Sequence, residues 1–258
     1  MQTVPIFDRL TFQRKRTPGI AIQTNLSYLP VNENNLVYRA ADLLMKECGL
    51  EKEGLLIRLQ KYIPVAAGMA GGSSDAAAAL IGVNRMFRLG FTLEKLMERG
   101  VRLGADVPYC LMRGTALAEG IGEKLTRLPA CPPCRILVAK PRISVSTKFV
   151  YSNLRADELQ AHPDIDRQIE ALENGDLKGV AEAMGNVLET VTIPAHPVIG
   201  EIKEQMMLGG ALNAMMSGSG PTVFGIFADP IAAEKTFQQL RRSRSLQQVY
   251  LTEPFCGK

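Results

Sequence analysis

Alternating apolar and polar residues predict that the chain begins with strands. The segment 6–12 carries Ile6, Leu10 and Phe12 among polar neighbours, which is typical of a half-buried strand. Residues 21–26 and 55–59 have the same character and predict two more strands.

Apolar residues at helical spacing predict the helices that follow. Asn34-Asn35 has the composition of a helix N-cap, residues 36–44 are apolar at helical spacing, and Gly49 is expected to end this helix. An alanine-rich helix is predicted over 75–87 and another over 92–103.

The pattern changes near residue 140. Short strands are expected before it, at 115–118 and 135–139. Long amphipathic helices dominate after it, together with two short apolar runs. The helices are expected at 164–174, 176–190, 197–208 and 230–242, and the runs at 212–216 and 222–227. We therefore predict a mixed α/β domain over 1–140 and a helix-rich α+β domain over 141–258.

Composition excludes several classes of protein. The chain has 258 residues, of which 46% are hydrophobic and 22% charged, so it is expected to fold around a sizeable core. No apolar stretch is long enough for a membrane span, and residues 1–5 do not have the pattern of a secretory signal. Five irregularly spaced cysteines argue against a disulfide framework. We expect a cytoplasmic protein without a membrane partner.

Two segments suggest a metal, redox or nucleic-acid site but also have purely structural interpretations. Cys131-Pro132-Pro133-Cys134 has redox or zinc spacing, but a proline-rich turn with incidental cysteines is favoured. The cluster at 241–244 suggests nucleic acid, yet basic residues at a helix end also complement the helix dipole, and no aromatic platform accompanies them. With a net charge of +4, we expect a small-molecule partner and no nucleic acid.

A loop of small residues offers a phosphate site. It consists of Pro64, Val65, Ala66, Ala67, Gly68, Met69, Ala70, Gly71, Gly72, Ser73 and Ser74. Its glycines let a ligand approach the main chain, and it leads into a helix whose first N–H groups are free. The Gly-Lys-Ser/Thr of a Walker loop and the G-x-G-x-x-G of a dinucleotide site are absent. The alternative is a turn needed only for packing.

Two further motifs accompany the loop. Gly104-Ala105-Asp106-Val107-Pro108 carries a carboxylate, which phosphoryl transfer often uses to accept a proton. Asp106 could equally be a cap or turn residue. In the run 216–224, alternating Ser217, Gly218, Ser219 and Gly220 suggest an anion-binding nest, or simply a hairpin connection.

Together the three motifs resemble those of the GHMP kinases. Gly-Gly-Ser-Ser-Asp-Ala at 71–76 is most similar to the branch that phosphorylates the 2-hydroxyl of a diphosphocytidyl-linked methylerythritol in isoprenoid biosynthesis. The resemblance implies a two-domain α+β fold with an N-terminal domain like ribosomal S5 domain 2. It implies ATP and Mg²⁺ as cofactors, and a monomer or homodimer.

The resemblance also implies roles for single residues. Asp106 corresponds to the general base, and it faces the substrate. The loop 64–74 would bind ATP, with Ser74 as a candidate Mg²⁺ ligand, and Asn35 would contact adenosine. Lys61 and 217–220 would lie near the substrate. For Lys61, a solvated surface lysine is the alternative.

The sequence differs from the family pattern at its N-terminus. The family's Ala-Lys-Ile-Asn-Leu strand and Gly-Tyr-His segment, which precede the region matching residues 1–4, are absent. We expect a longer gene with an upstream start. The alternative is a nucleotide-binding protein with little or no kinase activity, because the family lysine stabilises the charge being transferred.

Overall fold

The computed structural model describes residues 1–159 and 162–256. Packing divides the chain into two units. The first contains Met1, 6–65 and 70–127, and the second contains 2–5, 66–69 and the chain from Leu128 onward. The predicted boundary near residue 140 lies later than this division, because the strand at 135–141 pairs inside the second unit.

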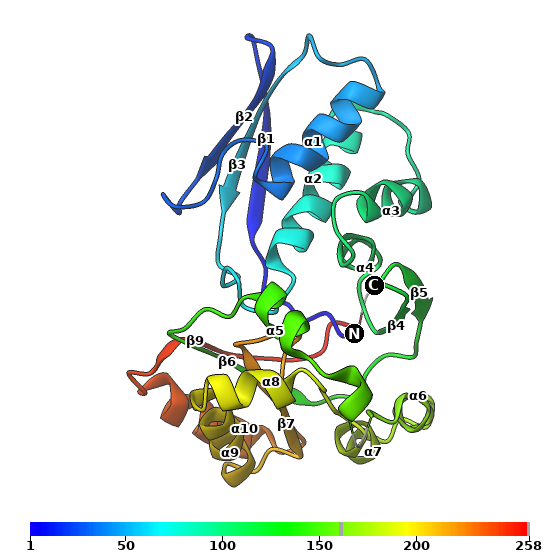
Figure 1. Ribbon diagram of the computed structural model, residues 1–258. Coiled ribbons are helices and arrows are strands. Elements are labelled where there is room, and N and C mark those ends of the chain that lie inside the picture. The colour runs from blue at the N-terminus through cyan, green and yellow to red at the C-terminus, as the bar shows by residue number, and fades with distance from the viewer. Residues whose placement is uncertain (160–161, 257–258) are drawn as a thin grey trace. The chain divides into compact units, whose positions relative to one another are not determined.

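The first unit contains a three-stranded sheet covered by helices (Figure 1). Its strands are β1 (Arg9–Lys15), β2 (Gly19–Thr24) and β3 (Gly54–Gln60), in the order β1-β3-β2. β2 runs parallel to β3, and β1 runs antiparallel to it. The carboxyl ends of β2 and β3 and the start of β1 therefore share one edge of the sheet.

Two helices form the core of this unit with the sheet. α1 (Leu36–Glu47) and α2 (Gly71–Phe87) lie side by side, α1 against β2 and α2 against β1. Their buried faces are apolar, and Ala40, Leu44, Ala76 and Leu80 belong to one core cluster with the buried residues of β3. α3 (Leu93–Val101), α4 (Val107–Met112) and a hairpin of β4 (Ala116–Glu119) and β5 (Lys124–Arg127) complete the unit.

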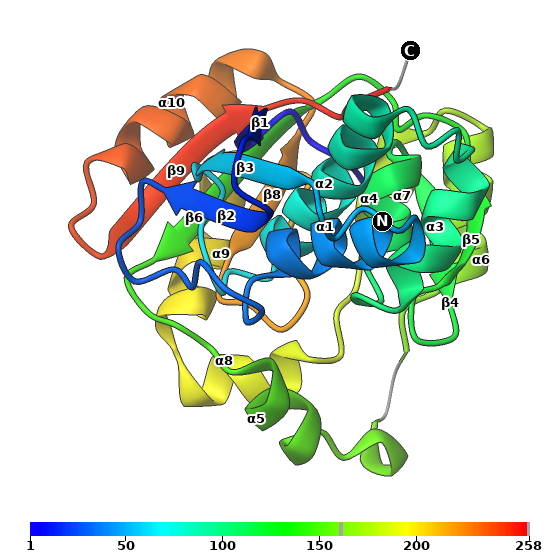
Figure 2. The ribbon, with the colours of Figure 1, turned by 90° about the horizontal axis from the view of Figure 1, so that it is seen from above.

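The second unit contains a four-stranded antiparallel sheet in the order β7-β8-β6-β9. The strands are β6 (Arg135–Pro141), β7 (Asn213–Met216), β8 (Val223–Phe227) and β9 (Leu246–Thr252). α9 (Val198–Leu208) and α10 (Pro230–Arg241) pack on this sheet, and Figure 2 shows α10 running beside β9.

The second unit also contains shorter helices. They are α5 (Thr147–Asn153), a 3-10 turn at Ala156–Glu158, α6 (Ile165–Glu173), α7 (Leu177–Glu182) and α8 (Glu189–Ala195). The helix predicted over 176–190 is wrong, because it divides into α7 and α8. The Asn186 amide between them donates to the carbonyl oxygens of Met216 and Gly218, each at 2.8 Å, so tertiary contacts hold the break open.

The predicted fold class is confirmed. A mixed α/β unit that begins with strands is followed by a helix-rich α+β unit, as expected. The predicted strands at 21–26, 55–59, 135–139 and 222–227 correspond to β2, β3, β6 and β8. Among the described residues, no helix combines the length and apolar composition needed to cross a bilayer.

Candidate active site

The first turn of α2 carries the glycines and serines of the predicted phosphate loop. The helix begins at Gly71 rather than at the predicted Asp75. The N–H of Ser74 bonds to the carbonyl oxygen of Ala70 at 2.8 Å, whereas the first amides of a helix have no acceptor within it. Gly71, Gly72 and Ser73 therefore present free N–H groups at the positive end of the helix dipole.

The backbone before this helix is unusual. Ala66, Gly68 and Ala70 have positive φ angles of 51°, 71° and 50°. Left-handed backbone costs an alanine about 1–2 kcal/mol, and such strain is typical of ligand-binding loops. Left-handed residues that alternate with ordinary ones turn successive N–H groups toward one side, which favours an anion.

Two hydroxyl groups stand at the same helix end. Ser73 and Ser74 are both half-buried. Within the described part of the chain, neither side chain takes part in a hydrogen bond inside the protein. They are therefore available to a ligand at the helix N-terminus.

The Asp106 segment lies next to this helix end. A Cβ built on Gly104 would stand 3.9 Å from the Ser73 hydroxyl oxygen. α4, which follows Asp106, packs against α2, and burial, followed by the charges of Asp106 and Asp75, raises the pKa of Cys110 to about 12. The first unit thus brings Asp106 and the first turn of α2 into one region.

The Asp106 carboxylate does not cap the helix that follows it. Asp106 precedes α4 at the N-cap position, yet its side chain makes no capping hydrogen bond, and the helix begins at Val107 with Pro108 in its first turn. Across residues 1–159 and 162–256, its carboxylate has no hydrogen-bond or ion-pair partner. Burial raises its pKa from the ordinary value. The side chain therefore does not act as the cap that sequence alone allowed.

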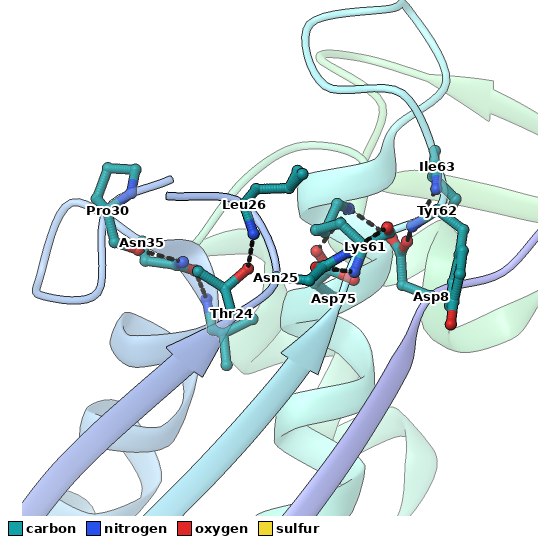
Figure 3. Close-up of polar contacts among 11 residues, drawn as sticks. Asp8, Thr24, Asn25, Leu26, Pro30, Asn35, Lys61, Tyr62, Ile63 and Asp75 are labelled. Atoms are coloured by element: carbon teal, nitrogen blue, oxygen red, sulfur yellow. Dashed lines mark hydrogen bonds and ion pairs between the residues drawn. The ribbon is translucent and has the colours of Figure 1, made fainter. Parts of the chain in front are cut away.

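A buried charge cluster occupies the shared edge of the sheet (Figure 3). The Lys61 ammonium donates to Oδ2 of Asp75 at 2.8 Å and to Oδ2 of Asp8. Oδ1 of Asp8 accepts the N–H of Ile63 at 2.9 Å and also the N–H of Tyr62. The surface interpretation of Lys61 is wrong, since this lysine is buried.

Asp8 is the member of the cluster that sequence reasoning missed. It lies 53 positions from Lys61, in no recognised motif, just ahead of β1. Burial raises the pKa of Asp75 to about 7, against the opposing effect of the Lys61 ammonium. Asn25, at the end of β2, holds the main chain of Lys61 through two hydrogen bonds of 3.1 and 2.8 Å.

Asn35 is the N-cap of α1, as predicted from its sequence position. Its Oδ1 accepts the N–H of Val37 at 2.9 Å, and its Nδ2 donates to the Pro30 carbonyl oxygen at 2.7 Å (Figure 3). Both ends of this buried side chain are thus engaged locally. The adenosine contact stays a prediction.

The third motif forms the connection between β7 and β8. The N–H of Ser217 donates to the carbonyl oxygen of Thr222 at 2.8 Å, which closes the hairpin. Gly218 and Gly220 have positive φ angles of 55° and 84°. The Ser217 hydroxyl donates to the Gly68 carbonyl oxygen at 2.8 Å, and Gly68 belongs to the same unit. This segment is therefore a hairpin that also contacts the phosphate loop.

Known families match both halves of the chain. Residues 35–114 match the GHMP kinases N terminal domain, and residues 168–245 match the GHMP kinases C terminal family. The first match includes Asn35, Lys61, the phosphate loop and Asp106, and the second includes 217–220.

Curated relatives share much of the sequence. A 4-diphosphocytidyl-2-C-methyl-D-erythritol kinase of Lachnospira eligens is 58% identical over 99% of this chain and 88% of its own length. The protein of the same name from Enterococcus faecalis is 48% identical over 96% of this chain and 87% of its own.

Solved structures share the fold. A crystal structure of 4-(cytidine 5'-diphospho)-2C-methyl-D-erythritol kinase has a TM-score of 0.81 at 30% identity, covering 98% of this chain and 88% of that one. A homoserine kinase from Cytophaga hutchinsonii, at 20% identity, also has a TM-score of 0.81 and covers 95% and 85% of the two chains. The chain therefore belongs to the GHMP kinase family and is an ATP-dependent kinase.

Proposed function

We propose that this kinase transfers the γ-phosphate of ATP to the 2-hydroxyl of 4-diphosphocytidyl-2-C-methyl-D-erythritol, a step of non-mevalonate isoprenoid synthesis. Relatives between 46% and 58% identical carry that kinase's name. The observation that carries the chemistry is Asp106, a half-buried carboxylate without a protein partner beside the first turn of α2. We also place the reaction in the cytoplasm, with a small-molecule acceptor.

The first turn of α2 supplies the phosphate contacts in this proposal. The free N–H groups of Gly71, Gly72 and Ser73 point along the dipole toward the ligand. The Ser73 hydroxyl adds a donor beside Gly104, two residues before Asp106. Donors fixed in this way stabilise the charge on the transferring phosphoryl group without having to reorganise.

Asp106 would act as the general base. Its carboxylate accepts the proton of the attacking 2-hydroxyl as the new P–O bond forms, and ADP leaves. A base works best when its pKa approaches the working pH, and burial moves the pKa of Asp106 in that direction. No cap or ion pair competes for this carboxylate among the residues that the structure describes.

Magnesium fits the residues present as a nucleotide-bound ion. No group of three or more His, Cys, Asp or Glu residues that could hold a metal occurs within the described chain. Mg²⁺ in kinases is held largely by phosphates and water, with one or two protein oxygens. The unpartnered hydroxyl of Ser74 suits that role. The ion, when bound, neutralises phosphate charge.

The third motif and Asn35 complete the proposal. Residues 217–220 would contact the substrate or the phosphates, because their positive φ angles expose successive N–H groups. Asn35 would contact adenosine through the backbone turn that it caps, since its own amide is engaged with Pro30.

Asp106→Asn tests the proposal. We expect kcat for the methylerythritol substrate to fall by roughly 10²- to 10⁴-fold, whereas calorimetry finds ATP affinity within about threefold of the wild type, because the phosphate contacts are main-chain amides. Asp42→Asn, which removes a more exposed carboxylate paired with Lys46 on α1, is the matched control and should retain full turnover. Equal losses of ATP affinity and turnover in Asp106→Asn would refute a role as base.

A further inference from the structure

Lys61 connects three segments that are far apart in the sequence. It follows β3, Asp8 precedes β1, and Asp75 lies one turn inside α2. The side chains of all three are 5% exposed or less. Figure 3 shows the lysine between the two aspartates at the end of the sheet. A lysine this deeply buried has to be paired with carboxylates, because an unpaired buried charge is strongly unfavourable.

The Lys61 ammonium also lies against the first residue of α2. A Cβ built on Gly71, the first residue of α2, would stand 3.3 Å from Nζ of Lys61 and 2.8 Å from Cγ2 of Ile63. The first turn of α2 therefore packs directly against the side chains of Lys61 and Ile63. The absence of a side chain at Gly71 is what permits this approach.

Asp75 depends on this lysine. Its Oδ2 accepts from Nζ of Lys61, while its Oδ1 is buried without a hydrogen-bond partner among the described residues. Removal of the ammonium would leave both oxygens of the buried Asp75 side chain without a protein donor, and the helix turn that carries it would shift to hydrate or rearrange that group.

The other end of the cluster is firmly anchored. Asp8 accepts two main-chain N–H groups in addition to the ammonium, and Asn25 brackets the Lys61 backbone on both sides. Lys61 is thus fixed by three elements of the sheet edge before it reaches the helix. Its position can define where α2 begins.

We propose that Lys61 is a positioning residue for nucleotide binding, which holds the first turn of α2 at the sheet edge through Asp75 so that the phosphate-binding amides keep one orientation. It acts on the nucleotide through the helix and does not contact the acceptor. This differs from the substrate contact expected by resemblance, because the ammonium is already shared between two carboxylates. The inference rests on the nucleotide half of the proposed function.

Lys61→Met tests this proposal. We expect the Kd for ATP to rise roughly 10- to 100-fold, since small displacements of a binding group have effects of that size, while KM for the acceptor stays within about twofold. Lys46→Met, which removes a more exposed ion pair on α1, is the matched control and should leave both constants unchanged. A higher acceptor KM with unchanged ATP affinity would overturn the proposal and make Lys61 a substrate ligand.

A second variant separates positioning from stability. Removing all three charges with Asp8→Asn, Lys61→Met and Asp75→Asn avoids an unpaired buried charge, and buried ion clusters replaced as a whole often regain stability. We expect this variant to recover a Tm near the wild type but still to bind ATP weakly. Recovery of both stability and ATP affinity would overturn the proposal.

The nucleotide readout also keeps the two proposals distinct. A wild-type enzyme that binds ATP but does not phosphorylate the methylerythritol substrate would refute the proposed acceptor. The effect of Lys61→Met on ATP binding would still be measured by calorimetry in that case, and unchanged affinity would still overturn the positioning role.

Discussion

Gly68 and Ser217 fit together so closely that residue 68 has no room for a side chain. The Ser217 hydroxyl donates to the Gly68 carbonyl oxygen at 2.8 Å, and the carbonyl oxygen of Ser217 occupies the place that a Cβ on residue 68 would take. Gly68 also has a φ of +71°. The hairpin between β7 and β8 therefore packs closely against the middle of the phosphate loop, within the second unit.

Gly68→Ala should reduce both stability and nucleotide binding. The added methyl collides with main chain, which cannot move away as a flexible side chain would, so we expect a loss of about 2–4 kcal/mol in the free energy of unfolding and weaker ATP binding. Urea unfolding and calorimetry measure the two effects.

Gly49→Ala provides the control for Gly68→Ala. Gly49 has a similar φ of +66°, but a Cβ there would meet nothing within 4 Å. This variant should lose only the roughly 1–2 kcal/mol of left-handed strain. If the two variants behave alike, backbone strain alone explains Gly68.

Asp106→Asn should stabilise the folded protein while it removes activity. Burial raises the pKa of this carboxyl in the folded state, so its ionised form is disfavoured there, and stability falls as the pH rises from the unfolded pKa through the folded one. The amide has no such cost. We expect Tm at pH 7.5 to rise by roughly 1–3 °C, and the gain to vanish toward pH 4. A lower Tm at pH 7.5 would show that the carboxylate has a stabilising partner.

Asp75 should give the protein a pH dependence of opposite sense to ordinary acid unfolding. Its pKa is about 7 in the folded protein and near the ordinary value of 3.8 when unfolded, so the folded state binds the extra proton between these values. Stability from this group is full below about pH 4 and is lost as the pH rises to about 7. Thermal unfolding should show the wild type falling relative to Asp75→Asn across that window. A constant difference between the two proteins would contradict the raised pKa.

Alkylation should distinguish the cysteines of the folded protein. Cys256 is exposed, whereas burial and two neighbouring carboxylates raise the pKa of Cys110 to about 12. Because the thiolate is the reactive form, iodoacetamide at pH 8 should label Cys256 first and leave Cys110 unmodified. Peptide mass spectrometry gives both rates, and equal rates would contradict the surroundings described for Cys110. Unfolding in urea should make Cys110 reactive, which is the internal control.

The sequence predicted the elements whose signals are local. Asn35 begins α1 as expected, because an asparagine cap needs only the helix that follows it. The strands at β2 and β3 were confirmed for the same reason, since their apolar runs are bounded by turn residues. The motif at 104–108 was selected for residue types that phosphoryl transfer uses, and the role of Asp106 stays a prediction.

Elements determined by distant contacts were not predicted. Glycine has a low helix propensity, so α2 was not expected to begin at Gly71. Close packing of Gly71 against Lys61 and Ile63 explains this early start. No helix was predicted over 107–112, where α4 lies, although Pro108 suits the first turn of a helix. Asp8 had no signal at all, because its significance comes from a lysine 53 positions away.

The alanine-rich face of α2 has a consequence for how this enzyme can evolve. Ala76 and Ala79 are buried in the core of the first unit, and their short side chains have no rotamers with which to accommodate a displaced neighbour. At Gly82 the surface of α2 meets the ring of Phe12, and a methyl there would press on that ring. Gly82 lies roughly 16 Å along the axis from Gly71. We therefore expect a larger side chain at this partly buried contact to displace α2 itself, so that the proposed phosphate site changes through a residue outside it.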